Sequence, residues 1–324
     1  MFGLFGAGPP TAAAGPFLIK FATLAPENST WMKHMRRLDK LIREKSDGQI
    51  GFRIYAGGIA GDELDVLRKL RIGQIHCAAF SGVGFGQILP MVRILDLPFL
   101  FRDYRETDLV HSSLEDFFTE HFREKGFELL AWAEVGNVHL FSREPIEKVE
   151  DLATLKVWTW SGDPISKKTF FFMGTQPIPL SITDVTTALN TKMVNTVYAP
   201  PLGALALQWH RSLKYVTALP LAHSTGAVLL SQKAASKISE PLLRMLKAEF
   251  RRAMIDLTSE LRNQTDETMT IILSSGLTLI PVPEDKELEK FHRVHDQVAQ
   301  EFSGKMYPRE LLDRVYEILQ RPRK

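Results

Sequence analysis

The side chains best suited to chemistry are scattered along this chain and complete no familiar catalytic set. His292 and His295 stand three residues apart on an expected helix, but no carboxylate or cysteine set joins them into a metal site. The sequence contains no G-x-S-x-G nucleophile elbow, no H-E-x-x-H zinc motif and no Walker loop. We therefore expect a protein that is not an enzyme and that needs neither a metal nor a cofactor.

A glycine-rich run and a single cysteine are the next candidates. Residues 81–86 (SGVGFG) follow an expected strand, but their spacing differs from that of a dinucleotide-binding loop, and Pro90 comes too soon for a long helix. We interpret this run as a loop that lets a ligand approach the backbone closely. Cys77 lies in the apolar run 75–80, which indicates an inert buried thiol, and a single cysteine excludes an intrachain disulfide.

The aromatic residues are more informative than the polar ones. Trp158 and Trp160 alternate along an expected strand, so they share one face of the sheet. Tyr198 and Trp209 flank the two-proline turn at 200–201. A tryptophan belongs to the core by default, so these residues either fill the core or form the apolar wall of a binding site.

Composition limits the class of protein. A chain of 324 residues suggests two domains, and 44% apolar with 24% charged residues is typical of soluble globular proteins. Forty basic and thirty-eight acidic residues leave a net charge of +2, which does not suggest a nucleic-acid partner. The uncharged runs 193–210 and 215–232 contain prolines and polar residues, so we expect buried core there. Residues 1–16 lack the basic start of a signal peptide. We interpret them as a disordered mature N-terminus or a cloning remnant, with the export signal absent.

Short apolar strands alternate with amphipathic helices from residue 17 onward, which predicts α/β lobes with helices on both faces of a sheet. Two lobes joined by more than one crossing form a hinged cleft, and ligands sit at the carboxyl ends of such strands. The mixed-charge run 102–106 is interpreted as a surface loop. The main expected strands cover 17–23, 50–55, 75–80 and 194–198, and the chain is expected to cross into a second α/β unit around 128–142. The main expected helices cover 29–45, 62–71, 166–173, 181–190, 241–273, 284–302 and 308–319.

Several ordered motifs carry a family resemblance. They are 55–63 (YAGGIAGDE), 73–76 (GQIH), 95–103 (LDLPFLFRD), 150–152 (EDL), 155–157 (LKV) and the stretch 173–200. With these motifs the chain resembles the substrate-binding subunits of TRAP transporters over about residues 17 to 320. The resemblance implies a periplasmic, two-lobed clamshell in which each lobe has a mixed or parallel sheet flanked by helices, and a long helix spans both lobes. Such a protein closes on a small molecule and delivers it to a membrane permease.

The resemblance also implies how the chain is divided. We expect one lobe from residues 17–136 with about 225–264, and the other from 137–224 with about 265–324. Some members of this family work beside a tetratricopeptide-repeat protein, and the resemblance leaves such a partner open.

The chain departs from the family pattern where that pattern grips a carboxylate. The family's arginine after L-K-x is Trp158 here, its hinge-strand arginine is Val138, and its asparagine before proline is Ala199. A buried carboxylate without a cation costs several kcal/mol, so we expect a hydrophobic or amphipathic ligand. The residues expected to form its wall are Phe80, Phe85, Val138, Trp158, Trp160, Ile182, Tyr198, Ala199 and Leu202.

Two alternatives stay open at this point. The ligand is an organic acid if a relocated cation such as Lys156, Lys20 or Arg102 reaches the cleft. The protein is a protein-binding sensor or scaffold if the apolar side chains fill the cleft themselves.

Overall fold

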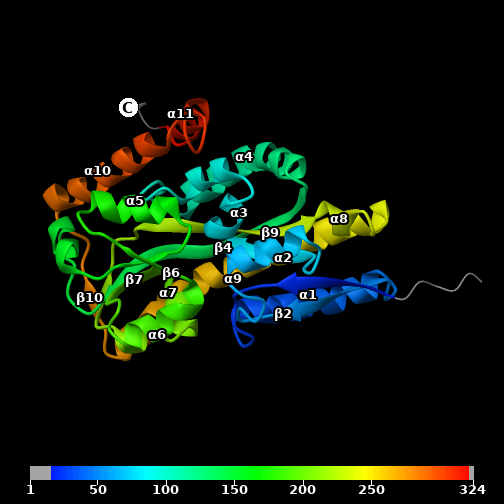
Figure 1. The fold of residues 1–324 in the computed structure, drawn as a ribbon, viewed down its shortest axis with the longest axis horizontal. Helices are drawn as coiled ribbons and strands as arrows, with labels where there is room; N and C mark the ends of the chain where they lie inside the picture. The colour runs from blue at the N-terminus through cyan, green and yellow to red at the C-terminus, as the bar shows by residue number, and fades with distance from the viewer. Residues whose placement is uncertain (1–15, 321–324) are drawn as a thin grey trace, which may run out of the picture.

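A mixed sheet of eight strands runs through the molecule (Figure 1), which a computed structural model describes over residues 16–320. The strand order is β10-β8-β4-β9-β3-β1-β2, with β7 paired to β4 outside this path. The strands are β1 (Phe17–Ala22), β2 (Ile50–Tyr55), β3 (Cys77–Ser81), β4 (Phe127–Ser142), β7 (Thr196–Ala199), β8 (Tyr215–Thr217), β9 (Ala222–Ser231) and β10 (Thr278–Ile280). A separate parallel pair consists of β5 (Trp158–Trp160) and β6 (Ile178–Leu180).

Helices cover both faces of this sheet, and polar side chains cap the first two of them. Ser29 caps α1 through the Met32 amide, and Asp62 caps α2 through the Glu63 amide. The helices are α1 (Thr30–Lys45), α2 (Glu63–Arg71), α3 (Gly82–Gly86), α4 (Tyr104–Glu124), α5 (Pro164–Phe172), α6 (Val185–Asn190), α7 (Pro201–Ala206), α8 (Gln232–Ala235), α9 (Glu240–Ser274), α10 (Asp285–Phe302) and α11 (Arg309–Ile318). Short 3-10 segments include η1 (Pro90–Asp96) and η3 (Ile182–Asp184).

The first half of the sheet follows the expected alternation of strands and helices. β1 pairs in parallel with β2 and β3, whereas β9 runs antiparallel to both β3 and β4, so the sheet is mixed. The apolar face of α1, with Met32, Met35 and Leu38, is buried in a core that also holds Phe21 and Phe52. In the other half, β7 and β8 pair antiparallel with β4, and β10 pairs in parallel with β8.

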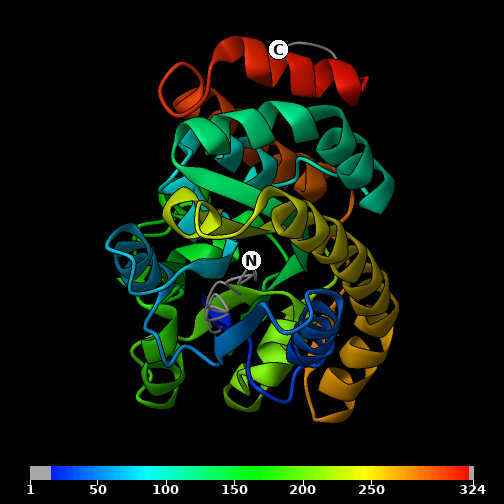
Figure 2. The same ribbon diagram turned by 90° about the vertical axis from the view of Figure 1, so that its right-hand side faces the viewer.

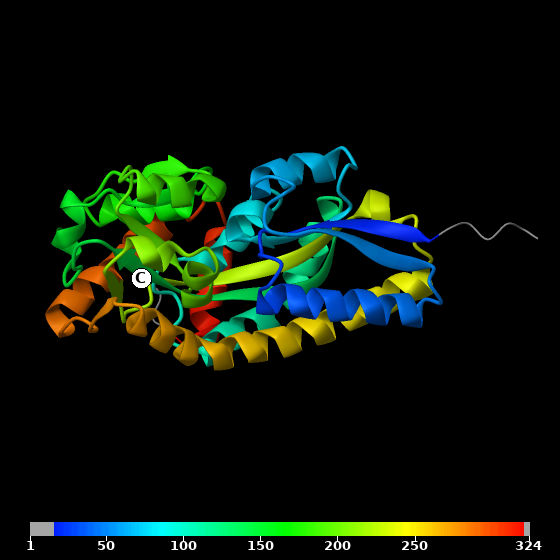
Figure 3. The same cartoon turned by 90° about the horizontal axis from the view of Figure 1, so that it is seen from below.

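Three segments connect the two halves. The 16-residue strand β4 and the antiparallel β9 pass from one half into the other, and the 35-residue helix α9 lies along both halves (Figure 3). The β4–β9 register shifts between Glu134 and Gly136, where Gly136 has a φ of +110° that favours glycine. The C-terminal helix α10 packs beside α5 (Figure 1), and α11 packs beside α4 (Figure 2).

Two sequence predictions about elements were wrong. The segment 102–106 is a surface loop only at its start, because Asp103 caps α4 through the Glu106 amide and the helix continues to Glu124. The crossing expected over 128–142 is the continuous strand β4. Residues 82–86 form the short helix α3 rather than a loop.

Two further findings concern the remaining predictions. Within residues 16–320 no helix combines the length and apolarity needed to cross a membrane. Cys77 is a buried free thiol, and burial raises its pKa well above its usual range, as expected of an inert core cysteine. The interpretation of residues 1–16 lies outside the described residues, apart from Pro16.

Candidate functional site

A cavity of about 690 Å³ lies between the two halves of the molecule. Its walls come from α1, β3, η1 and the middle of β4 on one side, and from β5, β7 and α7 on the other. Eight of the nine residues predicted as the ligand wall border it, namely Phe80, Val138, Trp158, Trp160, Ile182, Tyr198, Ala199 and Leu202. The cavity is large enough for a drug-sized ligand.

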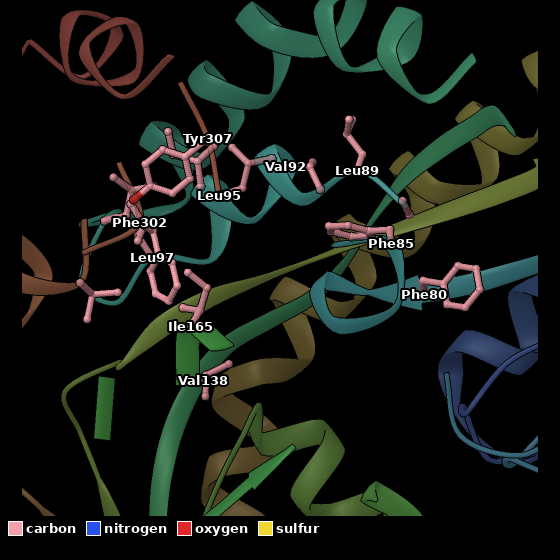
Figure 4. Packing of buried hydrophobic residues seen from close by; sticks show 14 of the residues in the cluster. Phe80, Phe85, Leu89, Val92, Leu95, Leu97, Val138, Ile165, Phe302 and Tyr307 are labelled. Carbon is pink, nitrogen blue, oxygen red and sulfur yellow. The ribbon is translucent and has the colours of Figure 1, made fainter. Parts of the chain in front are cut away.

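Phe85 is the exception among the predicted wall residues. It is not among the side chains that border the cavity, and its ring packs edge-to-face on Phe122 and Trp132. Figure 4 shows Phe85 with Leu89 in the same packed cluster. The physical reason is the helical turn of α3, which directs Phe85 into the core beneath α4 instead of toward the cavity.

The aromatic wall is a stacked group that belongs to both core and cavity. Trp158 stacks on Tyr198 with ring centroids 4.9 Å apart and meets Trp209 edge-on at 5.3 Å. The Trp158 indole donates to the Leu180 carbonyl and is 1% exposed. Trp158 and Trp160 lie on the same side of β5, as their alternation predicts, with centroids 6.1 Å apart. Trp158 therefore borders the cavity, but nearly all of its surface is packed against neighbouring side chains.

The glycines of α3 leave room for neighbouring side chains. A Cβ on Gly82 would lie 1.8 Å from Oδ2 of Asp96, and one on Gly84 would lie 2.2 Å from the Phe80 ring and 2.7 Å from Oε2 of Glu63. Two buried carboxylates thus reach the cavity wall because these positions lack side chains. The expected close approach of a ligand to this backbone stays a prediction, and Gly82 does border the cavity.

Arg93 was missed by the sequence analysis, although it borders the cavity. Its guanidinium is 5% exposed, and it pairs with Asp96 (Nε–Oδ2, 3.0 Å) and Asp163 (Nη2–Oδ1, 2.7 Å). Asp163 also caps α5 through the amides of Ile165 and Ser166. One buried cation is therefore held between two buried aspartates, and burial raises the pKa of Asp96 to about 6.

The cations that the sequence analysis nominated lie elsewhere. Lys156 and Arg102 are exposed, Arg102 pairs with Glu106, and Lys20 does not border the cavity. Within the described chain, Arg93 is the one lysine or arginine on the cavity wall, whereas Glu63, Asp96, Glu134 and Asp163 are carboxylates there.

A second set of charges lies where β4 and α9 cross. Arg262 of α9 pairs with Glu134 (2.6 Å) and with both oxygens of Asp108 (2.7 and 2.8 Å). His223 also borders the cavity, and burial holds its pKa well below its usual range, so its ring is neutral. Arg262 is thus shared between Glu134 and Asp108, whereas Arg93 is shared between Asp96 and Asp163.

Glu63 is a buried carboxyl at the N-terminus of α2. Its Oε1 accepts from the Ser81 amide (2.7 Å), and its Oε2 accepts from the Ser81 hydroxyl (2.9 Å) and the Gly84 amide (2.7 Å). Burial outweighs these hydrogen bonds and raises the pKa of Glu63 to about 7.

This raised pKa gives a pH-dependent prediction. The folded protein binds the Glu63 proton more tightly than the unfolded chain, so folding stability from this group falls as the pH rises from about 4.5 to about 7. The stability difference between wild type and Glu63→Gln is expected to change by up to about 1.4 kcal/mol per pH unit in that window. Urea denaturation at pH 5, 6, 7 and 8 measures it, and parallel pH profiles would contradict it.

The two halves also touch directly beside the cavity. Asp62, at the start of α2, accepts from the Trp160 indole (3.0 and 3.1 Å), the Ser181 hydroxyl and the Ile182 amide (3.3 Å). Gln87 donates to the Gly162 carbonyl at 3.2 Å. These contacts join residues that are at least 75 positions apart in the sequence. The Arg93–Asp163 pair joins residues 70 positions apart. Hydrogen bonds therefore hold the N-terminal end of α2 against the cavity wall formed by β5 and η3.

Comparisons with known proteins agree on one family. The model for "Bacterial extracellular solute-binding protein, family 7" matches residues 21–305. The 2,3-diketo-L-gulonate-binding periplasmic protein YiaO of Escherichia coli is 24% identical over 70% of this chain and 67% of its own length. The sialic acid-binding periplasmic protein SiaP of Vibrio cholerae is 20% identical over 88% of both chains. Some other relatives match over about half their length, such as 49% of a solute-binding protein from Chromohalobacter salexigens.

Solved structures share the fold across nearly the whole chain. The sugar acid binding protein DctPAm of Advenella mimigardefordensis, in complex with galactonate, superposes with a TM-score of 0.88 at 18% identity over 95% of this chain and 99% of that one. A TRAP periplasmic solute binding protein from Polaromonas, bound to D-erythronate, gives 0.86 at 19% identity over 95% and 99%.

Proposed function

Because the chain belongs to family 7 of the bacterial extracellular solute-binding proteins, the solute receptors of TRAP transporters, we propose that it captures a predominantly apolar small molecule in the cavity between its lobes. It then delivers this molecule from the periplasm to a membrane permease. The family consists of transporter receptors and not of enzymes, and the two-lobed fold is the one that the sequence predicts.

One observation carries the choice of ligand, namely the state of the only arginine on the described cavity wall. Arg93 is already paired with Asp96 and Asp163, so a ligand carboxylate would have to displace one of them or enter without a counter-charge. Either event costs several kcal/mol in a buried site. The apolar remainder of the wall gains about 0.8 kcal/mol for each ligand methylene that it buries.

The two alternatives have different support. Named relatives and neighbours bind sugar acids and other carboxylates, which favours an organic acid, but the cations nominated for that role lie outside the cavity. A filled cleft, as a scaffold would need, disagrees with a volume of about 690 Å³.

The organic-acid alternative is tested by direct titration. We expect no binding of galactonate, D-glucuronate or succinate at millimolar concentration in isothermal titration calorimetry. Micromolar binding of any of these acids would contradict the proposal and favour the alternative.

Capture is proposed to proceed by hinge closure. We infer lobes at 17–136 with about 225–264 and at 137–224 with the remainder, because β4, β9 and α9 are the segments that cross between them. Asp62 then stabilises the closed state, because its carboxylate accepts hydrogen bonds from the Trp160 indole and the Ser181 hydroxyl across the cleft.

Closure predicts a change in shape. Small-angle scattering is expected to give a smaller radius of gyration when ligand saturates the wild type, and a weaker decrease for Asp62→Ser. Serine keeps the α2 cap but is too short to reach Trp160. A radius that does not change with saturating ligand would count against the clamshell.

A further inference from the structure

We propose that the ligand is an organic cation, with an apolar or aromatic body that ends in an ammonium group. This inference rests on the proposed function, because it places the ligand in the same cavity, and it specifies which polar group accompanies the apolar body.

The first support is the charge balance at the polar end of the cavity. Glu63, Asp96 and Asp163 all border the cavity and are at most 9% exposed, and Arg93 is the one strong cation among them. Two negative charges therefore lack a counter-charge whenever all three are ionised. A ligand ammonium reduces this excess of negative charge, whereas a ligand carboxylate adds to it.

The second support is the position of the aromatic group beside these carboxylates. The Tyr198 hydroxyl contacts Oδ2 of Asp163 at 3.5 Å, and the Tyr198 ring stacks on Trp158. Ring faces of tryptophan and tyrosine attract cations, and the attraction is stronger in a desolvated site. The aromatic pair and the Asp163 carboxylate thus lie together on one part of the wall.

The third support is the acceptor capacity that Asp163 retains. Its Oδ1 accepts from Arg93 and from the helix amides of Ile165 and Ser166. Its Oδ2 receives only a long contact from the Tyr198 hydroxyl in the described chain. A carboxylate oxygen offers two lone pairs, so Oδ2 accepts a hydrogen bond from an ammonium without breaking the pair with Arg93.

The test uses three probes with one common body: 4-phenylbutylamine, 4-phenylbutanol and 4-phenylbutyrate, titrated calorimetrically at pH 7.5. We expect the amine to bind at least tenfold more tightly than the alcohol, and the acid to bind most weakly. In Asp163→Asn, the ratio of amine to alcohol affinity is expected to fall several-fold. Asparagine caps a helix as well as aspartate does, and Asp96→Asn provides a second variant if Asp163→Asn does not fold.

Asp103→Asn is the matched control. Asp103 also caps a helix, α4, but it is exposed and does not border the cavity. This variant removes the same charge and should leave the ratio unchanged. An acid that binds as tightly as the alcohol would overturn the inference. If the alcohol binds best, the ligand carries no ammonium group, but the proposal of an apolar ligand in this cavity is retained. Failure of all three probes to bind at millimolar concentration would contradict the proposed apolar function as well.

Discussion

Arg93→Met is expected to lower the free energy of unfolding by about 3–5 kcal/mol. The substitution keeps the apolar stem but leaves Asp96 and Asp163 facing each other in a buried site without their counter-charge. Urea denaturation followed by circular dichroism measures the loss. Arg102→Met is the matched control, because Arg102 is exposed and pairs only at the surface with Glu106, where a pair contributes at most about 1 kcal/mol.

The same group offers an internal check. Adding Asp96→Asn and Asp163→Asn to Arg93→Met removes the unpaired charges, so the triple variant should recover part of the lost stability. Equal losses in Arg93→Met and Arg102→Met would show that the buried triad does not hold the wall of the cavity together.

Trp158→Arg is expected to cost about 3–5 kcal/mol of folding stability, because it removes a packed indole and buries a cation in its place. Trp158 is 1% exposed and stacks on Tyr198, so the substitution destabilises the lobe that contains residues 137–224. A loss of ligand affinity in this variant would therefore not separate binding from folding. Urea denaturation checks this expectation. A fully stable Trp158→Arg variant would contradict the packing of this side chain.

Leu202→Arg separates the ligand effect from the folding effect. Leu202 borders the cavity at the start of α7 and is half-buried, so an arginine there keeps its charge in water. The variant should fold normally and bind an apolar ligand at least tenfold more weakly than Leu202→Met, which conserves the apolar wall. Equal affinities of the two variants would remove Leu202 from the ligand site.

Elements were predictable from the sequence where the pattern is local. β2 begins and ends at the expected residues, and the expected helices at 29–45 and 62–71 match α1 and α2 to within one residue at each end. α4 was missed because its start is a run of mixed charges. A signal was present further along, since Val110, Leu114, Phe118 and Phe122 recur every fourth residue, as on one buried helix face.

The candidate site was predictable only in its apolar part. Period-two alternation placed Trp158 and Trp160 on one face, and both border the cavity. Arg93 gave no such signal because it lies in an apolar run and because its partner Asp163 is 70 residues away. Phe85 looked equivalent to Phe80, and the unexpected turn of α3 directed it into the core.

The proposed function requires that the cavity hold an apolar-bodied ligand and not a sugar acid or dicarboxylate. Mass spectrometry can identify the small molecules released by denaturing the natively purified protein, with Leu202→Arg purified in parallel as the control. We expect a compound with an extended apolar or aromatic body that is present in stoichiometric amount in the wild type and depleted in the variant. A sugar acid or small dicarboxylate recovered in stoichiometric amount from both proteins would contradict it.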